Sequence, residues 1–533
     1  MVDESVGAAP TEGASKERQD RQGRQGRQGR RGRRSSRSSV SSNPQVPFAQ
    51  LRRHFEPTAV VSASELEAIH EASLVVLRDV GVDVLEAEAR ELYSAAGCSV
   101  DGERVRFDPE MVTEVIVSAP SEFTLHAPNP AHNLRIGGDN VVFGAVASAP
   151  FVSDAATGRR DGNREDFRNL LKLTQHFNAI HMHGGYPVEP ADIHPSVRHL
   201  HATHDLLTLS DKALHAYSLG RQRNRDCLEM VRIVRQVSEA QLDDEPSMHT
   251  VINSSSPLRL DMAMCQGIIE FARRGQVVIM TPFTLAGAMA PVTIAGAVTQ
   301  QNAEALAGIV LTQLVRSGAP VVYGGFTSNV DMKSGSPAFG TPEFIKAAML
   351  GGQLARRYRL PYRSSNVNAA NAIDAQAGYE SSFSLWGAIM GGANIVFHGA
   401  GWLEGGLRAS FEKLVLDADL LGMMQTFLEP IGVEPADLAL EAIADVGPGG
   451  HFFGTQHTQD RYREAFYQPM VSDWRNFESW EEAGSPEASG KLPSLVQQAL
   501  SEFAVPELDD AVRAELDAFV DRRVAEGGVP TDF

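Results

Sequence analysis

The chain from Val141 onward repeats one pattern of apolar and polar positions. A short apolar run is followed by a loop with Gly, Ser, Asn or Pro, and then by a longer stretch with apolar residues at helical spacing. The runs predict strands that begin near Val141, Ile180, Ala213, Met248, Val277, Val321, Pro361 and Ile395. The longer stretches predict helices over 164–177, 197–210, 224–237, 259–274, 301–317, 342–358, 375–392 and 410–428. Eight strand–helix units are typical of a closed (β/α)8 barrel, and an open doubly wound sheet is the alternative.

The segments on either side of this repeat have other patterns. Residues 1–46 contain a tandem RQG repeat, further arginines and a Ser-rich run without aromatic residues, which predicts a disordered tail. Residues 47–137 are expected to form an α-rich lead-in, residues 138–430 the barrel, and residues 431–533 a helical C-terminal layer. The predicted fold class is therefore α/β, a TIM barrel with added helices at both ends.

Composition restricts the class of function. The 533 residues are 43% hydrophobic and carry a net charge of −19, which argues against a general nucleic-acid binder, although the basic tail could touch nucleic acid or an acidic partner. The cysteines Cys98, Cys227 and Cys265 form no CxxC pair, as expected of a reducing compartment without thiolate metal sites. No apolar run is long enough to span a membrane and no secretory signal is evident, so we expect a cytoplasmic protein.

The strand ends are the expected place for chemistry, because a barrel carries its active site at the carboxyl ends of its strands. These ends are rich in Gly, Ser and Asn, with several aromatic residues and few carboxylates. The stretch 360–380 is an example of such a strand end. Its polar run RSSNVN is expected either to line a site or to form a solvated loop. No GxGxxG, Walker A or HExxH motif follows a strand, which argues against nucleotide chemistry.

Aromatic residues with scattered carboxylates indicate a site for a compact cation, held by cation–π contacts and charge. Each aromatic residue could equally belong to the core. His398 ends the eighth predicted strand and is expected to face the site. His201 and His204 have the i, i+3 spacing that can hold a metal, but no partner Glu accompanies them, and we predict no metal site.

Several long segments resemble one protein family. They are VYGGFTSNVDMKSGSPAFGTPE at 322–343, QLARRYRLP at 353–361, DAQAGYES at 374–381 and GANIVFHGAGWLEGGLRASFEKLVLDADLL at 392–421. They are similar to the trimethylamine methyltransferase family of corrinoid-dependent enzymes, and the likeness runs from about residue 50 to near the C-terminus. The resemblance implies a (β/α)8 barrel that passes a methyl group from a methylated amine to Co(I) of a separate corrinoid protein.

The trimethylamine enzymes of that family carry pyrrolysine in the loop after the seventh strand. The corresponding segment here, SSNVNAAN at 364–371, has ordinary residues. The resemblance therefore points to the non-pyrrolysine branch, which includes glycine betaine methyltransferase. A quaternary ammonium leaves as a neutral tertiary amine and needs less activation, so placing its methyl group in line with cobalt can supply much of the catalysis.

We therefore predict a methyltransferase that demethylates a quaternary, betaine-like amine. Its expected partners are a small quaternary or tertiary methylamine and a corrinoid protein, whose cobalamin is the only cofactor, and the protein is expected to be a homo-oligomer. The catalytic candidates are His398, Asn368 and Glu404, and the substrate-binding candidates are Phe326, Asp331, Tyr379, Glu380, Trp402 and Asn366. The alternatives are a non-catalytic paralogue that binds a methylamine, and a barrel lyase or aldolase using a metal or Lys333.

Overall fold

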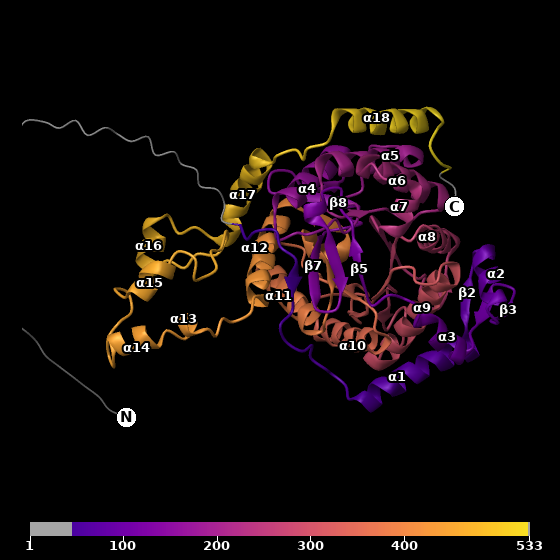
Figure 1. Cartoon of the computed structure of the whole chain (residues 1–533), viewed down its shortest axis with the longest axis horizontal. Coiled ribbons are helices and arrows are strands. Elements are labelled where there is room, and N and C mark those ends of the chain that lie inside the picture. The colour runs from indigo at the N-terminus through magenta and orange to yellow at the C-terminus, as the bar shows by residue number, and fades with distance from the viewer. Residues whose placement is uncertain (1–44, 531–533) are drawn as a thin grey trace, which may run out of the picture. The chain divides into compact units, whose positions relative to one another are not determined.

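The computed structural model describes residues 45–530 (Figure 1). The predicted disordered tail lies outside these residues, apart from its last two positions. Within the described part, no helix is long and apolar enough to cross a bilayer. The three cysteines are buried and unpaired, as the sequence predicts.

The N-terminal part combines short helices with small strands, whereas the sequence predicted an α-rich region. It contains β1 (Leu51–Arg52), α1 (Ala63–Val75), the π turn η1 (Val76–Val80), β2 (Val82–Val84), α2 (Ala87–Ala95), β3 (Ser99–Asp101), β4 (Arg104–Arg106), α3 (Pro109–Ile116), β5 (Glu122–Leu125), the 3-10 turn η2 (Pro130–His132) and β6 (Leu134–Gly137). Ser62 caps α1 in a capping box with Glu65. The hydroxyl of Tyr93 donates a hydrogen bond of 2.8 Å to the Ala307 carbonyl, which ties α2 to the central part of the molecule.

A curled, mostly parallel sheet forms the centre of the molecule. Its order is β1-β7-β19-β18-β15-β13-β11-β10, with β1 antiparallel at the edge. The parallel strands are β7 (Asn140–Ala145), β10 (Leu214–His215), β11 (Met248–Ile252), β13 (Val277–Met280), β15 (Val321–Gly324), β18 (Tyr362–Ser365) and β19 (Ile395–Ala400). The class is thus mixed α/β, as predicted. Most of the side chains of these strands are buried, because helices cover the outer face of the sheet and other side chains fill the inner one.

The helices between these strands lie close to their predicted positions. They are α4 (Arg164–His176), α5 (Pro195–Leu209), α6 (Arg221–Arg235), α7 (Glu239–Asp244), α8 (Met262–Arg273), α9 (Ile294–Val315), α10 (Pro342–Tyr358), α11 (Ala375–Met390) and α12 (Phe411–Leu428). The alternation of strand and helix is confirmed. The short helix α7 and the early start of α9 were not predicted.

The strand predicted near Ile180 is the exception. Only isolated parallel bridges form there, from Gly144 to Met182 and from Met182 to Ala213. The sequence explains the short pairing, because two glycines and a proline follow at 184, 185 and 187. The ring Nδ1 of His181 also accepts a hydrogen bond of 3.0 Å from the Phe143 amide, in place of a backbone carbonyl. Met182 therefore lies between β7 and β10 without a regular strand around it.

Small sheets lie beyond the carboxyl ends of the central strands. One has the order β20-β21-β8-β9 and contains β8 (Phe151–Asp154), β9 (Gly158–Asp161), β20 (Trp402–Leu403) and β21 (Arg408–Ser410). A second contains β14 (Leu285–Ala286), β16 (Ser328–Val330) and β17 (Pro337–Ala338), and β12 (Arg259–Leu260) extends the N-terminal sheet of β2. The turn η3 (Glu404–Gly406) joins β20 to β21. These loops carry side chains to the site.

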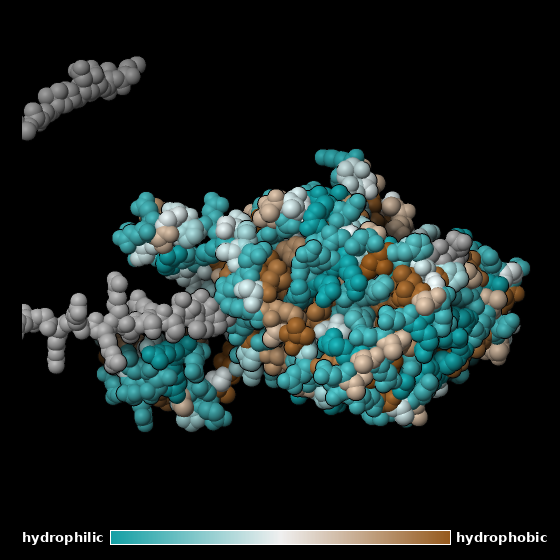
Figure 2. All heavy atoms as spheres, turned by 90° about the horizontal axis from the view of Figure 1, so that it is seen from above, coloured by the Kyte–Doolittle hydropathy of each residue, from teal (hydrophilic) through white to brown (hydrophobic). Residues whose placement is uncertain are grey.

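The C-terminal part contains helices, and its helices α17 and α18 pack against the helices around the sheet. It contains α13 (Pro435–Leu438), α14 (Leu440–Val446), α15 (Gln456–Arg461), α16 (Phe477–Glu482), α17 (Ala488–Glu502) and α18 (Asp510–Ala525). Helix α17 packs on α12 and α4, and α18 packs on α5 and α6. Residues 429–470 contain no buried side chain. Figure 2 shows that the face seen from above is mainly hydrophilic, with hydrophobic patches between the polar side chains.

Candidate active site

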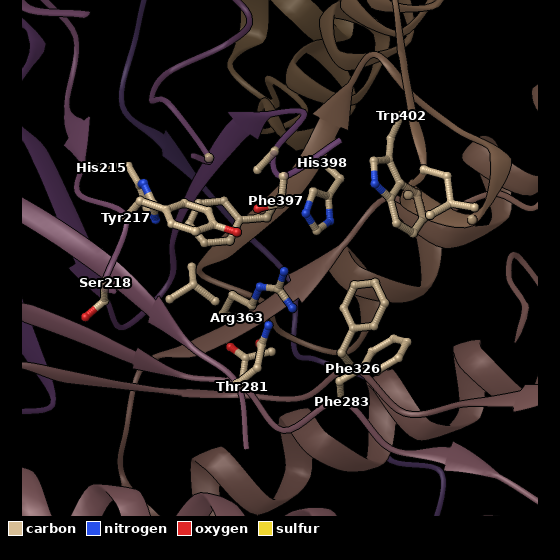
Figure 3. Close-up of a pocket in the computed structure, with 18 of the residues that line it drawn as sticks. His215, Tyr217, Ser218, Thr281, Phe283, Phe326, Arg363, Phe397, His398 and Trp402 are labelled. Carbon is tan, nitrogen blue, oxygen red and sulfur yellow. The ribbon is translucent and has the colours of Figure 1, made fainter. Parts of the chain in front are cut away.

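A cavity of about 250 Å³ lies at the carboxyl ends of the parallel strands (Figure 3). Each parallel strand of the central sheet, or the loop that follows it, contributes to the lining, so the cavity lies where the strand ends were expected to carry chemistry. Its lining consists of Ala147, Ser148, Pro150, Gly184, His215, Tyr217, Ser218, Val251, Asn253, Met264, Thr281, Phe283, Phe326, Arg363, Phe397, His398, Trp402, Gly405, Gly406 and Leu407. The space equals that of roughly eight water molecules at about 30 Å³ each. It suits a small organic ligand.

Aromatic rings form one wall of the cavity. The rings of His398 and Trp402 are stacked, with centroids 5.0 Å apart and planes inclined by 13°. Phe326 meets both of them edge to face, at 5.8 Å from His398 and 5.9 Å from Trp402. We call these three residues the aromatic wall. A cation in contact with aromatic faces gains about 0.5–2 kcal/mol per ring, so this wall can hold a methylated ammonium group.

An irregularity in β19 turns His398 toward the cavity. Val396 pairs with Phe143 and Ala400 pairs with Ala145, so β19 has two extra residues between these pairs. His398 lies in this bulge with a φ of 54°, and such bulges re-aim side chains. Burial, together with the positive charge of Arg363, holds the pKa of His398 well below its ordinary value. The imidazole is therefore neutral at physiological pH.

The loop after Trp402 is held by backbone contacts that require glycine. Gly406 has a φ of 96°, and a Cβ placed on it would lie 2.5 Å from Cζ2 of Trp402. The amide of Gly405 donates to the Asn368 carbonyl at 3.0 Å, and the amide of Glu404 donates to the Ala370 carbonyl at 3.0 Å. These contacts keep the loop against the Trp402 indole and fix its orientation.

Arg363 brings a positive charge into the cavity. It lies on β18, where side chains alternate between the two faces: the Tyr362 hydroxyl donates outward to the Ala348 carbonyl at 2.7 Å, whereas Arg363 points inward. The Arg363 side chain is only 2% exposed. Its Cζ lies 5.2 Å from the ring centroids of both Phe326 and Phe397. Burial lowers the pKa of Arg363 to about 9, so the guanidinium remains charged at neutral pH.

Several polar atoms of the cavity lack a partner among the described residues. They include Nε and Nη1 of Arg363, Oγ1 of Thr281, Nδ1 of His215 and Nδ1 of His398. Buried polar groups in proteins are nearly always hydrogen-bonded, so a cluster of exceptions in one cavity is typical of a binding site. No Asp or Glu is among the residues that line the cavity.

Of the residues proposed from the sequence, the structure brings Phe326, His398 and Trp402 together in the cavity. Asn366 and Asn368 are buried behind it. The side-chain amide of Asn366 donates to the Gly399 carbonyl at 3.0 Å, and that of Asn368 donates to the Ser381 hydroxyl at 2.8 Å. Both asparagines support the loops that carry the aromatic wall and do not line the cavity.

The remaining candidates lie outside the cavity. Tyr379 is 61% exposed on α11, and Asp331 is an exposed residue of the β16–β17 hairpin. The buried carboxylate of Glu380 accepts hydrogen bonds from the amides of residues 369 and 370, at 2.9 and 3.1 Å. Glu404 forms ion pairs with Arg159 and Arg408, at 2.9 and 3.5 Å. The sequence motif does not show in which direction these side chains point. In the structure they face neighbouring backbone, partner arginines or solvent.

Arg363, Thr281 and Tyr217 also line the cavity. None of them was named as a site candidate, although Tyr217 and Thr281 lie at predicted strand ends and Arg363 begins the polar run RSSNVN. For Arg363 a usable signal existed. In the strand YRSS, a period of two places positions 363 and 365 on the face opposite to Tyr362. An arginine on the inner face of a buried strand is exceptional, because charged side chains are almost never fully buried without a partner.

A second buried cation lies outside the cavity. Lys413 on α12 is fully buried, pairs with Asp417 and donates to the Ser381 hydroxyl at 2.8 Å. Asp417 also accepts a hydrogen bond of 2.9 Å from the Gly401 amide. We call Asn368, Ser381, Lys413 and Asp417 the supporting network. It connects the loops after β18 and β19 to α11 and α12.

The histidine pair considered as a metal site has other partners. Nε2 of His204 contacts Asp517 on α18 at 2.6 Å. Within residues 45–530, the side chains that bring three ligand-type atoms together are Glu67, His70 and Glu71 on α1. His70 is occupied there by a hydrogen bond of 2.8 Å between its Nδ1 and the Tyr358 hydroxyl. Lys333, the lysine considered for an aldolase, is exposed and lies outside the cavity.

Comparison with known families agrees with the resemblance read from the sequence. Residues 26–528 match the family described as Trimethylamine methyltransferase (MTTB). The chain belongs to the trimethylamine methyltransferase family. It is therefore a methyltransferase, as predicted.

Two relatives of this family member cover most of its length. A glycine betaine methyltransferase of Desulfitobacterium hafniense is 35% identical over 88% of this chain and 98% of its own. A trimethylamine methyltransferase of Methanosarcina mazei is 30% identical over 87% of this chain and 95% of its own. Among solved structures, the monomethylamine methyltransferase of Methanosarcina barkeri matches with a TM-score of 0.45 and 10% identity, over 83% of this chain and 93% of that one.

Proposed function

We propose that this enzyme demethylates a quaternary, betaine-like amine and passes the methyl group to Co(I) of a separate corrinoid protein. The observation that carries the proposal is the aromatic wall of Phe326, His398 and Trp402, which faces a small cavity at the carboxyl ends of the strands. Membership of the family supports the reaction class, and the similarity to a glycine betaine methyltransferase supports the substrate class.

The reaction moves one methyl group. The partner's Co(I) would supply both electrons of the new bond to the methyl carbon and become Co(III), while the C–N bond would break with its electron pair on nitrogen, so that a neutral tertiary amine leaves. The positive charge on nitrogen falls during this step, so the aromatic wall binds the substrate more than it lowers the barrier. Its contribution is orientation: it fixes the ammonium so that one methyl group points at the acceptor, and a well-placed reacting pair can gain about 7–11 kcal/mol.

The rim of the cavity fits an acceptor carried on another protein. Pro150, Asn253 and Leu407 line the cavity and are exposed at the surface. A corrin ring brought by a partner protein could approach the substrate over these residues. The neutral ring of His398 presents no charge that would compete with the ammonium for the aromatic wall.

We also infer that the curled sheet closes into a barrel. Met182 bridges Gly144 on β7 and Ala213 beside β10, which are the two ends of the parallel series. Met182 would then stand for the second of eight strands. A closed wall would explain how residues from β7, β10 and β19 reach one cavity.

The exposed apolar residues of 429–470 support the prediction of a homo-oligomer. They are Ile431, Val433, Leu438, Leu440, Ile443, Phe452, Phe453, Tyr462 and Phe466. Large exposed apolar patches are typical of interaction sites. A single molecular mass equal to one chain, measured by light scattering at micromolar concentration, would contradict this proposal.

Trp402→Ala provides the test of the methyl-transfer function. The protein is mixed with a Co(I) corrinoid protein and glycine betaine, and formation of methyl-Co(III) is followed by absorbance. We expect methyl transfer by the wild type and a loss of about 100-fold in Trp402→Ala, because the ammonium loses an aromatic face and its orientation. Trp474→Ala, at a tryptophan that is 68% exposed, is the matched control. Binding without methyl transfer by the wild type would indicate the non-catalytic paralogue.

A further inference from the structure

We propose that Arg363 is the binding site for a carboxylate in this cavity, so that the ligand must carry an anionic group beside its methylated ammonium. The inference rests on the proposed function for the methylated ammonium, but the anion site itself is argued from Arg363 and its surroundings. Neither the family match nor the relatives assign a role to this residue.

The first argument is the state of the guanidinium. An arginine side chain has five N–H donors, and no hydrogen bond or ion pair joins the guanidinium of Arg363 to any of residues 45–530. Its Nε and Nη1 are buried without a partner. The rings of Phe326 and Phe397 contact its charge at 5.2 Å but leave the in-plane donors free. Donors arranged in a planar fork match the two oxygens of a carboxylate.

The second argument is the direction of the side chain. Figure 3 shows the guanidinium of Arg363 pointing into the space bounded by Phe326, Phe397 and His398. The Oγ1 of Thr281, in the same lining, is also buried without a partner. A hydroxyl beside a guanidinium adds a further donor for an anion, so the two residues form one polar end of the cavity.

The third argument is charge. The cavity has an aromatic wall suited to a cation, yet the one fully charged side chain in its lining is a cation and no carboxylate balances it. A ligand with only a positive charge would be repelled by Arg363 inside a water-poor space. A zwitterion removes the conflict, because its carboxylate neutralises Arg363 while its ammonium lies against the aromatic wall.

The spacing of the two ends sets the class of ligand. Phe326 takes part in both, since its ring contacts Arg363 at 5.2 Å and meets Trp402 at 5.9 Å. One phenyl ring therefore separates the anion site from the ammonium site. A short linker between carboxylate and quaternary nitrogen fits this separation, as in a betaine of a small α-amino acid. Choline and tetramethylammonium lack the anion and are excluded by the charge of Arg363.

The test measures binding by calorimetry, independently of methyl transfer. The probes are glycine betaine, choline and tetramethylammonium, and the proteins are the wild type, Arg363→Gln, Arg363→Lys and Arg225→Gln. Arg225 is a surface arginine paired with Glu270, is not among the lining residues, and serves as the matched control. Circular dichroism and thermal unfolding establish that each variant is folded.

We expect the wild type and Arg225→Gln to bind glycine betaine about 100-fold more tightly than choline, because a buried donor set left unpaired rejects the ligand that lacks the acceptor. Arg363→Gln should lose about 100-fold in affinity for glycine betaine and gain affinity for choline. The affinity of Arg363→Lys for glycine betaine should lie between those of the wild type and Arg363→Gln, since a lysine keeps the charge without the planar fork.

Equal affinities of the wild type for glycine betaine and choline would overturn the anion site, as would unchanged binding of glycine betaine by folded Arg363→Gln. The companion measurement of methyl-Co(III) separates the two proposals. Binding that depends on carboxylate and on Arg363, without methyl transfer, would refute the proposed function and leave the anion site standing. Transfer from choline as fast as from glycine betaine would refute the anion site alone.

Discussion

The two buried cations Lys413 and Arg363 have different surroundings. Lys413, in the supporting network, has an ion pair with Asp417 and a hydrogen bond to Ser381. Arg363, in the cavity, has two flanking rings and no acceptor among the described residues. Both side chains are almost completely removed from water.

The difference distinguishes a buried charge that stabilises the fold from one that is available to bind a ligand. A buried charge that is paired and hydrogen-bonded is compensated within the fold, and breaking the pair is strongly destabilising. A buried charge without an acceptor lowers the stability of the free protein, and such residues collect at binding sites. Removal of Lys413 should therefore lower the stability of the fold. Removal of Arg363 should weaken ligand binding without lowering that stability.

Lys413→Ala should produce the largest loss of stability. We expect the free energy of unfolding to fall by about 3–5 kcal/mol, because Asp417 would remain buried without its partner. Urea unfolding measures this loss. The double variant Lys413→Met/Asp417→Leu should recover much of it, since no charge is then left buried. A Lys413→Ala protein as stable as the wild type would show that the pair of Lys413 and Asp417 does not stabilise the fold.

Gly406→Ala should have the next largest effect on stability, and it should act on the aromatic wall. Alanine is strained at a φ of 96°, and its Cβ would meet the Trp402 indole at 2.5 Å. We expect a loss of about 1–3 kcal/mol in the free energy of unfolding, together with weaker binding of glycine betaine. Gly490→Ala, where nothing lies within 4 Å of the added Cβ, is the control. Full ligand affinity in Gly406→Ala would show that the Trp402 orientation does not matter.

Arg363→Met should not reduce the stability of the free protein. An apolar chain of similar length removes a desolvated charge, although two cation–π contacts are lost, so we expect a change between zero and a gain of about 2 kcal/mol. Urea unfolding in the absence of ligand measures it. A loss comparable to that of Lys413→Ala would mean that Arg363 is structural as well.

The smallest effect is expected at His204, a third cationic group, which is partly exposed between α5 and α18. The carboxylates of Asp205 and Asp517 raise the pKa of His204 above its ordinary value of 6.5. Its stabilising contribution is therefore complete below that value and is lost as the pH rises through the raised pKa. His204→Gln should cost less than about 1 kcal/mol at pH 5.5 and nothing at pH 9. A constant difference between wild type and variant at both pH values would contradict this origin.

The sequence predicted the regular part of the fold and the aromatic part of the site. Strong helical periodicity located α10 at 342–358 without error, because capping and apolar spacing agree there. The strand near Ile180 was over-predicted, because periodicity does not show that glycines will shorten the pairing. His398 and Trp402 follow directly from their position at a strand end.

The rest of the site needed three-dimensional information. Tyr379 and Glu380 are neighbours in one family motif, yet the first side chain faces solvent and the second faces the chain around residue 370. Arg363 lies in the polar run RSSNVN, which the sequence indicated as a site lining or a solvated loop, but the run alone does not distinguish a buried arginine from one in a solvent-facing position. Only the burial of β18 on both sides shows that no such position exists in this strand.

The ring of His181 has a consequence for the dynamics of the sheet. Its Nδ1 accepts the amide of Phe143, and burial lowers the pKa of His181 to about 3, so the acceptor is available throughout the neutral range. Hydrogen exchange at the Phe143 amide therefore reports the opening of this side-chain hydrogen bond, which adds to the backbone hydrogen bonds between β7 and residues 181 and 182. The Phe143 amide is therefore a position at which local opening of the sheet beside Met182 can be measured.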